Sequence, residues 1–287
     1  MEIAWCRVEA VKCERRIEAK IKKEITEMAD TSKVAIITGG AKGIGEGCTR
    51  AFCGAGWRVV ISDYDEKSAV ALTQEVNAKG PGECHFEFAD MRKEEDIRRV
   101  IDNTVKRFGR LDTLVNNAGW HPPTLPIDDF SVQDFLDLLQ LNLIAVFVGC
   151  KLALPHLRKT RGSIVNMSSL VAQLGQEGAT IYCATKGAVS AFTKALAIDE
   201  AKHGVRVNAI LPGNIYTHMR ITSVAASPDP KGLHEWLERT QHLGRSGTIE
   251  EAGQTCLFLA GDQASFITGI DLILSGGAEL GYGPKIP

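Results

Sequence analysis

The 287-residue sequence has no uninterrupted apolar run of the ~18 residues that a membrane-spanning helix needs. It also lacks an excess of charge, because its formal net charge is only −2, and this gives no electrostatic reason to expect nucleic acid or a membrane surface as a partner. No Cys-x-x-Cys or His-Glu-x-x-His spacing occurs, so no metal site is expected. With 44% hydrophobic and 24% charged residues, the composition is that of an ordinary globular protein and excludes disorder, collagen-like repeats and disulfide scaffolds.

The eight cysteines are scattered along the chain rather than clustered. Single, widely spaced thiols are typical of a reducing compartment, where most cysteines pack as small hydrophobic side chains. We therefore expect a cytoplasmic protein.

Glycine and proline are absent from the first 32 residues, although the whole chain has 28 glycines and 10 prolines. This segment carries seven basic and seven acidic side chains, with an apolar stripe at helical spacing through Ile17, Ile21, Ile25 and Met28. A signal peptide needs an apolar core and a mitochondrial transit peptide lacks acidic residues, so neither fits. We interpret residues 1–32 as a charged helical extension without a function, in preference to a targeting or oligomerisation segment. Residues 33–287 form the working domain.

From residue 33 onward, short β-branched runs alternate with helical stretches. Such alternation predicts parallel strands joined by helical crossovers, because a hairpin cannot join parallel strands. The chain is therefore expected to be an α/β protein with a doubly wound, seven-stranded parallel sheet, a Rossmann fold, in a single domain. The expected strands are 33–38, 58–62, 83–88, 111–115, 164–167, 205–210 and 270–274. One expected helix follows the glycine-rich stretch after the first strand and ends at residue 54. The others cover 66–78, 93–108, 131–154, 180–202 and 249–260. The helix over 131–154 opens with a capping box at Ser131 and Asp134.

A glycine-rich loop, T-G-G-A-K-G-I-G at residues 38–45, lies between the first strand and the first helix. Glycines at this place let the backbone turn tightly and approach a pyrophosphate at the helix N-terminus, although a purely structural turn is the alternative. The loop residues expected to bind a dinucleotide are Gly39, Lys42, Gly43, Ile44 and Gly45.

Asp63, at the end of the second strand, is the carboxylate that accepts hydrogen bonds from a ribose and repels a 2′-phosphate. It favours NAD over NADP. Lys42 argues in the other direction, since a cation in the loop attracts a phosphate, but Asp63 has the position of the discriminating group.

Tyr182 and Lys186 are four residues apart on an expected helix, so they share a face. A neighbouring ammonium lowers the pKa of a phenol and suits the pair to general acid–base chemistry, although this spacing also occurs on solvated helix faces. Ser169 ends the fifth strand at the edge where such sheets bind ligands, and there it can hydrogen-bond a substrate oxygen. Asn142 interrupts an apolar stripe, either as a satisfied core amide at a helix irregularity or as a functional group.

In this order and on these elements, the residues resemble the short-chain dehydrogenase/reductase family over residues 32–287. A closer likeness, in residues 119–123, 168–171, 212–215 and 276–283, is to members that act on hydroxysteroids or L-fucose-like sugars. The residues that carry the family resemblance are 38–45, 116–119, Asn142, Ser169, Tyr182, Lys186, Pro212 and Gly213.

The resemblance implies a role for each matched residue. Tyr182 is the acid–base group, Lys186 lowers its pKa and holds the nicotinamide ribose, Ser169 orients the substrate oxygen, and Asn142 anchors a water that relays protons. The further cofactor contacts implied are Asp90 and Met91 at the adenine, Asn117 and Gly119 along the cofactor, and Pro212, Gly213, Ile215 and Thr217 at the nicotinamide amide.

The substrate side is expected to include His121, after the fourth strand, and Gln176, six residues before Tyr182. Surface positions are the alternative for both. Residues 214–245 follow the sixth strand and are suited to a lid over the substrate.

The expected function is NAD-dependent oxidation of a secondary alcohol, either a 17β-hydroxysteroid or an L-fucose-like sugar. The alternatives are a carbonyl reductase of small ketones and a dinucleotide-binding protein without activity. From the resemblance we also expect a homotetramer, assembled through the helices at 131–154 and 180–202.

Overall fold

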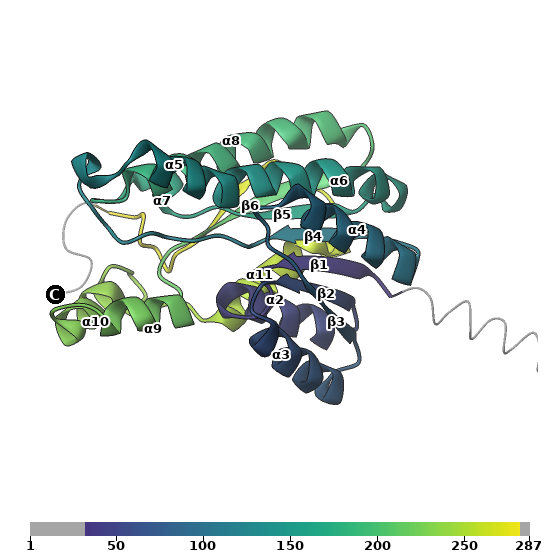
Figure 1. Ribbon diagram of the computed structural model, residues 1–287, viewed down its shortest axis with the longest axis horizontal. Helices are drawn as coiled ribbons and strands as arrows, with labels where there is room; N and C mark the ends of the chain where they lie inside the picture. The colour runs from purple at the N-terminus through teal and green to yellow at the C-terminus, as the bar shows by residue number, and fades with distance from the viewer. Residues whose placement is uncertain (1–31, 282–287) are drawn as a thin grey trace, which may run out of the picture. The chain divides into compact units, whose positions relative to one another are not determined.

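The computed structural model describes residues 32–281, so the helical extension expected over residues 1–32 lies, except for Ser32, outside the described residues. The described chain forms one seven-stranded parallel sheet in the order β3-β2-β1-β4-β5-β6-β7, which confirms the predicted doubly wound fold (Figure 1). All seven predicted strands are present, with ends within two residues of those expected. The strands are β1 Val34–Thr38, β2 Arg58–Asp63, β3 Glu83–Phe88, β4 Thr113–Asn116, β5 Ser163–Met167, β6 Arg206–Pro212 and β7 Asp271–Leu274.

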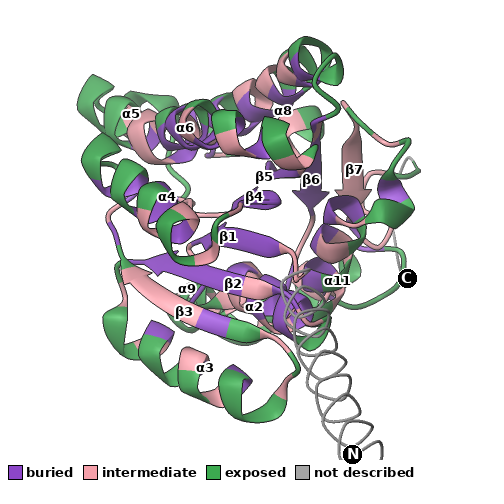
Figure 2. Ribbon diagram, turned by 90° about the vertical axis from the view of Figure 1, so that its right-hand side faces the viewer, coloured by how far each residue is buried: buried purple, intermediate pink, exposed green. Residues whose placement is uncertain are grey.

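Helices cover both faces of the sheet and enclose two apolar clusters (Figures 1 and 2). The strands β1, β4 and β5 are buried along their whole length, as parallel strands covered on both faces must be. One layer contains α2 Gly43–Gly54, α3 Glu66–Lys79 and α11 Ile249–Ala260. The other contains α4 Glu94–Phe108, α5 Val132–Leu139, α6 Ala145–Thr160 and α8 Thr180–Ala201.

The helices α2 and α11 touch backbone to backbone. A Cβ added to Gly47 would lie 1.9 Å from the carbonyl oxygen of Ile249, and one added to Gly253 would lie 2.1 Å from the carbonyl oxygen of Gly47. Both glycines are therefore required for this approach, which fixes α2 against α11.

The helix expected over 131–154 is longer than predicted and is interrupted. The capping box of Ser131 and Asp134 is confirmed at its start, and a π-helical turn, η2 Gln140–Ile144, joins α5 to α6. The prediction that it ends at residue 154 was wrong. The helix passes through Pro155 because Leu157 packs fully buried in the core, and it stops only at Arg161, which has a φ of 52°.

By length and composition alone, the run Val132–Thr160 is apolar enough to cross a membrane, with a mean hydropathy of 1.8 in its most apolar 18-residue window. Half of that window is buried in the fold, where α6 packs against α4 and the sheet. Core helices of globular proteins meet the same criterion, and this run forms part of the core.

Residues 214–245, expected to form a lid, contain two short helices, α9 His218–Ala225 and α10 Pro230–Arg239. Neither helix was predicted. Thr217 caps the first and Asp229 the second. A one-turn helix, α7 Val171–Leu174, was also not predicted. The six cysteines among the described residues are free thiols. Within residues 32–281, no group of three or more His, Cys, Asp or Glu side chains is placed to hold a metal ion.

Candidate active site

The glycine loop lies at the carboxyl edge of the sheet, beside the point where the strand order reverses between β1 and β4. Gly39 and Gly43 have φ angles of 62° and 57°, which favour glycine. A Cβ on Gly45 would lie 2.0 Å from the carbonyl oxygen of Gly39, whereas a Cβ on Gly43 would meet only the side chain of Thr217, at 3.5 Å. The loop is thus tightly packed beneath and open toward Thr217. This shape fits a pyrophosphate at the N-terminus of α2.

Asn117 and Thr38 hold the loop from the neighbouring strand end. The Asn117 side chain donates to the carbonyl oxygens of Thr38 and Gly39, each at 3.0 Å. The Thr38 hydroxyl oxygen accepts from the backbone N–H groups of Asn117 and Ala118, also at 3.0 Å. Ile44 packs its side chain against the core. Asn117 and Ile44 were both predicted to contact the cofactor. In the structure their side chains hold the backbone of the glycine loop in place.

Asp63 ends β2 as expected and is 7% exposed. Its carboxylate accepts from the backbone N–H of Ala41 in the glycine loop at 3.0 Å and from that of Asp65 at 2.9 Å. Lys42 extends to Asp65, with 2.5 Å between its Nζ and the carboxylate oxygen, and this contact lowers the pKa of Asp65 to about 2. The carboxylate of Asp63 is therefore hydrogen-bonded to the glycine loop, while the charge of Lys42 is neutralised by Asp65.

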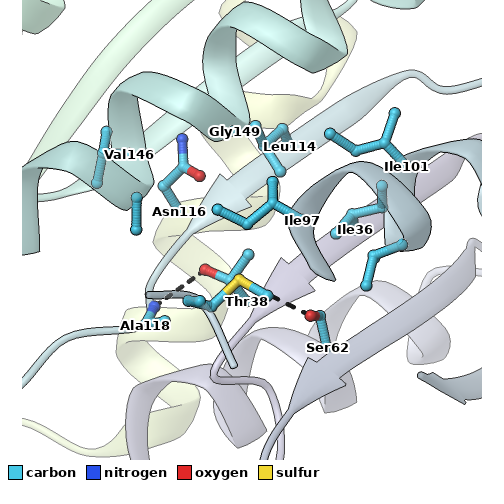
Figure 3. A pocket seen from close by; sticks show the side chains of 13 residues that line it. Ile36, Thr38, Ser62, Ile97, Ile101, Leu114, Asn116, Ala118, Val146 and Gly149 are labelled. Carbon is cyan, nitrogen blue, oxygen red and sulfur yellow. Dashed lines mark hydrogen bonds between the residues drawn. The ribbon is translucent and has the colours of Figure 1, made fainter. Parts of the chain in front are cut away.

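Asp90 and Met91 follow β3 at the same edge. Asp90 forms a bidentate pair with Arg92, with a shortest distance of 2.7 Å, and this contact lowers the pKa of Asp90. The Ser62 hydroxyl donates to the Met91 sulfur at 3.9 Å. Figure 3 shows the adjoining pocket, where the labelled Thr38, Ser62 and Ala118 lie near one another, with apolar walls from α4 and α6. The lining residues belong mainly to the apolar core, and the contact of Met91 with the adenine stays a prediction.

The wall opposite the glycine loop comes from the end of β6. Gly213 donates its N–H to the carbonyl oxygen of Leu274 at 2.9 Å, and Ile215 pairs with Gly247. Thr217 caps α9 and is the residue nearest to the open side of Gly43. Pro212, Gly213, Ile215 and Thr217 therefore run from the sheet edge to the lid, and their contact with the nicotinamide amide stays a prediction.

Tyr182, Lys186 and Ser169 meet at this edge. Helix α8 places the Lys186 Nζ 5.7 Å from the centre of the Tyr182 ring, and the ammonium donates to the carbonyl oxygen of Met167 at 2.8 Å. Ser169 follows β5 and hydrogen-bonds the Tyr182 hydroxyl. The predicted group of a phenol, an ammonium and a hydroxyl is therefore formed.

Burial dominates the electrostatics of this group. It raises the pKa of Tyr182 to about 12, against the hydrogen bond from Ser169, which lowers it. It lowers the pKa of Lys186 to about 8. The net shift of the phenol's pKa is therefore upward, opposite to the direction predicted from the ammonium alone. Loss of water around the buried phenolate sets this direction.

Asn142 lies in the π-helical turn, where both ends of its side-chain amide are bonded to the backbone of Trp120. The carbonyl oxygen accepts from the Trp120 N–H, and the amide donates to the Trp120 carbonyl, each at 2.9 Å. A Cβ on Gly119 would lie 3.2 Å from this amide oxygen and 3.5 Å from the Lys186 Nζ. Asn142 is thus a satisfied core amide at a helix irregularity, and it fixes the loop beside Lys186. Its water relay remains a prediction.

Thr185 was not predicted and links these residues. Its hydroxyl donates to the carbonyl oxygen of Tyr182 at 2.8 Å and accepts from the Asn142 amide at 3.3 Å. The only signal in the sequence was a threonine on the buried face of the helix that carries Tyr182 and Lys186. Thr185 connects the two helices that position the site.

His121 and Gln176 come together at Tyr182. The ring centres of His121 and Tyr182 are 4.2 Å apart. The His121 Nε2 lies 3.3 Å from the Gln176 Oε1, and its Nδ1 lies 2.6 Å from the carbonyl oxygen of Pro122. The structure therefore places His121 beside the phenol and Gln176 beside His121, and their contact with substrate stays a prediction.

Replacing Lys186 with methionine is expected to stabilise the fold at pH 7. Burial lowers the pKa of Lys186 from 10.5 to about 8, which costs the folded wild type roughly 3 kcal/mol while the ammonium is charged. The variant avoids this cost but loses the hydrogen bond to the carbonyl of Met167, which offsets about 1 kcal/mol of its gain in stability. As the pH rises, Lys186 loses its proton at a lower pH in the folded protein than in the unfolded chain. The stability of the wild type therefore rises between about pH 8 and pH 10.5, and the advantage of the variant disappears over that range. Urea unfolding at pH 7 and pH 10.5 measures both effects.

The exposed Lys202, which follows α8, provides the control. Lys202→Met should change the unfolding free energy by less than about 0.5 kcal/mol at either pH. Equal stabilities of the Lys186→Met variant and the wild type at pH 7 would contradict a buried ammonium.

The comparisons with known proteins agree with this geometry. A family model described as enoyl-(acyl carrier protein) reductase matches residues 39–279. The chain belongs to the short-chain dehydrogenase/reductase family, and it is an oxidoreductase that uses NAD(H) to oxidise a secondary alcohol.

Individual relatives show which members of the family the chain resembles. The L-fucose dehydrogenase of Oryctolagus cuniculus is 49% identical over 253 residues, which are 88% of this chain and 87% of the relative. Among solved structures, levodione reductase has a TM-score of 0.84 at 28% identity and covers 87% of this chain and 98% of its own. The 3-ketoacyl-(acyl-carrier-protein) reductase of Brucella melitensis, complexed with NADH, has a TM-score of 0.78 at 29% identity and covers 86% and 98%.

The chain's own residues supply binding and proton transfer. When bound, NAD supplies the acceptor for the hydride of the alcohol carbon and a positive charge that favours an ionised phenol. In the predicted reaction Tyr182 takes the proton of the alcohol hydroxyl, and Ser169 hydrogen-bonds the same oxygen. Lys186, held by Met167, is predicted to stabilise the phenolate that this reaction requires. The rigid supports from Asn142 and Thr185 keep these groups in place for the reaction.

Proposed function

We propose that the protein oxidises a secondary hydroxyl of a free sugar of the L-fucose type with NAD. The observation that carries the proposal is the pair of His121 and Gln176 beside Tyr182, in a chain 49% identical to an L-fucose dehydrogenase. A hexose presents several hydroxyls around the reacting carbon. Two side chains that donate and accept hydrogen bonds next to the phenol match that pattern better than an apolar wall does.

The test is NADH formation with L-fucose and with estradiol, measured side by side. We expect the larger kcat/KM with L-fucose. His121→Ala should raise KM for the sugar by on the order of tenfold, because a buried hydrogen bond to substrate is worth about 1–2 kcal/mol. Turnover of estradiol without turnover of L-fucose would contradict the proposal. A hydroxysteroid is then the second candidate, since the exposed Trp120 and Met219 flank the site.

Asp63→Ala is expected to raise the use of NADP relative to NAD by on the order of tenfold in kcat/KM. Removing the carboxylate removes its repulsion of a 2′-phosphate and its bonds to the ribose. Because Asp63 also accepts from the loop N–H of Ala41, both cofactors should bind more weakly, and the ratio is the informative quantity. Lys42→Met is the matched control and should leave the ratio unchanged, since Lys42 pairs with Asp65. A ratio that moves only in the Lys42 variant would assign cofactor choice to that lysine.

We propose further that the chain assembles as a homotetramer through α5–α6 and α8. The support is a set of exposed apolar side chains on these helices, namely Val132, Leu136, Ile144, Phe147 and Ile198. Light scattering on the purified protein should give four times the chain mass, and a monomeric mass would contradict the proposal.

A further inference from the structure

The lid has almost no apolar anchor. From residue 216 to residue 240, the one buried residue is Arg220, which is 9% exposed, and α10 has no buried residue. Helices of this length are not stable on their own, and most helices in proteins are held by an apolar face packed on the core. The position of this lid must therefore depend on polar contacts.

Arg220 is the centre of those contacts. Its Nη2 lies 2.6 Å from the Glu238 Oε1 on α10, and its Nη1 donates to the hydroxyl of Ser246. The Nη2 also lies 3.4 Å from the Nδ1 of His234, and the guanidinium carbon lies 5.2 Å from the centre of the Tyr216 ring. The pair of Arg220 and Glu238 thus ties α9 to α10.

The same cluster reaches the residue where the lid rejoins the core. Glu238 accepts from the backbone N–H of Ser246 at 2.5 Å and from its hydroxyl at 3.0 Å. The next residue, Gly247, pairs with Ile215, which closes the base of the lid. Both ends of the lid are therefore joined to the pair of Arg220 and Glu238.

Arg220 also contacts Thr217, the residue that faces the glycine loop. Arg220 donates its backbone N–H to the hydroxyl of Thr217 at 3.3 Å, so the two residues form the first turn of α9. Thr217 is the nearest neighbour of the open side of Gly43. Moving Arg220 moves Thr217 away from the loop that binds the dinucleotide.

We propose that Arg220 and Glu238 are positioning residues that hold the lid, through Thr217, against the cofactor side of the site. Loss of the carboxylate leaves a charged guanidinium buried without an ionic partner, and its return to water opens α9. Cofactor and substrate then bind more weakly, while the chemical step at Tyr182 is unaffected. The proposal rests on the NAD(H)-dependent activity and not on which alcohol is oxidised.

The decisive variant is Glu238→Gln, which keeps the size of the side chain and an acceptor for Ser246 but removes the charge. We expect the NADH dissociation constant, measured by fluorescence, and KM for the alcohol each to rise by on the order of tenfold, with kcat within about twofold of the wild type. Glu235→Gln is the matched control. It removes an exposed carboxylate from the same helix, paired with Lys231 at 3.9 Å, and should change nothing.

A double variant separates positioning from simple damage. Adding Arg220→Met to Glu238→Gln removes the unpaired buried charge but does not restore the tie between α9 and α10, so the double variant should bind NADH better than Glu238→Gln alone but more weakly than the wild type. Tryptic cleavage at Lys231 and Arg239 should be fastest in the single variant, and this readout applies even if binding is too weak to measure.

Three results would overturn the proposal. They are NADH affinity and KM in Glu238→Gln equal to those of Glu235→Gln, a fall in kcat with binding unchanged, or a double variant no better than the single one. Because NADH binding requires no substrate, failure of the L-fucose assay leaves this test intact.

Discussion

Tyr182→Phe is expected to lower kcat by about 10²–10⁴-fold while NADH affinity stays within about twofold of the wild type, because the variant has no group that takes the alcohol proton. Phenylalanine keeps the ring whose centre lies 4.2 Å from that of His121, tilted by 45°, and 5.7 Å from the Lys186 Nζ. Within the protein, the substitution removes the hydrogen bond between the phenol and Ser169. The comparison of kcat with the NADH dissociation constant therefore isolates the chemical role of the hydroxyl.

Ser169→Ala is the companion variant, since it removes the same hydrogen bond and leaves the phenol. It should lower kcat by less than Tyr182→Phe does. If Tyr182→Phe retained turnover near that of the wild type, another group would have to serve as the base. A fall in turnover together with NADH affinity would instead assign the hydroxyl a structural role. Persistence of binding with loss of turnover also excludes the alternative of a dinucleotide-binding protein without activity.

Gly45→Ala is expected to weaken NADH binding by on the order of a hundredfold. Its Cβ would lie 2.0 Å from the carbonyl oxygen of Gly39 and 2.6 Å from the Nδ2 of Asn117. A carbonyl of the loop itself has to move, so the loop N–H groups lose their fit to the phosphates, and one charge-assisted hydrogen bond contributes about 1.5–3 kcal/mol. The measurement is NADH titration by fluorescence together with thermal unfolding.

Gly54, at the end of the same helix, gives a matched control because a Cβ there meets no atom within 4 Å. Gly54→Ala should leave NADH affinity unchanged and stabilise the fold by roughly 0.5–1 kcal/mol, the ordinary benefit of alanine in a helix. Wild-type NADH affinity in Gly45→Ala would show that the close contact at Gly39 relaxes without disturbing the ligand.

The sheet could be predicted because its central strands are buried on both faces. Buried parallel strands such as β1 and β2 appear in the sequence as short β-branched runs between helices, and their order follows from the crossover rules. The lid helices α9 and α10 were not predicted, since Arg220 is the only buried residue in either. A signal for α10 was nevertheless present, because Leu233, Trp236 and Leu237 follow helical spacing.

Site residues were predicted where the evidence is local. The glycine loop and the spacing of Tyr182 and Lys186 are patterns within a few residues, and a helix or a turn converts them directly into geometry. The bonds between Asn142 and Trp120, and the pair of Arg220 and Glu238, join residues 22 and 18 positions apart, and only the tertiary fold creates them. The direction of the pKa shift at Tyr182 was mistaken for the same reason, because burial is a property of the whole fold.

The backbone contact of α2 with α11 has a consequence for the order in which the protein is made. Gly47 lies beside the glycine loop, whereas its partners Ile249 and Gly253 belong to α11, which leaves the ribosome about 200 residues later. The dinucleotide site therefore stays incomplete during most of synthesis. Contacts so distant in sequence form late and slowly, and a nascent chain has to keep the exposed face of α2 from other partners until α11 arrives.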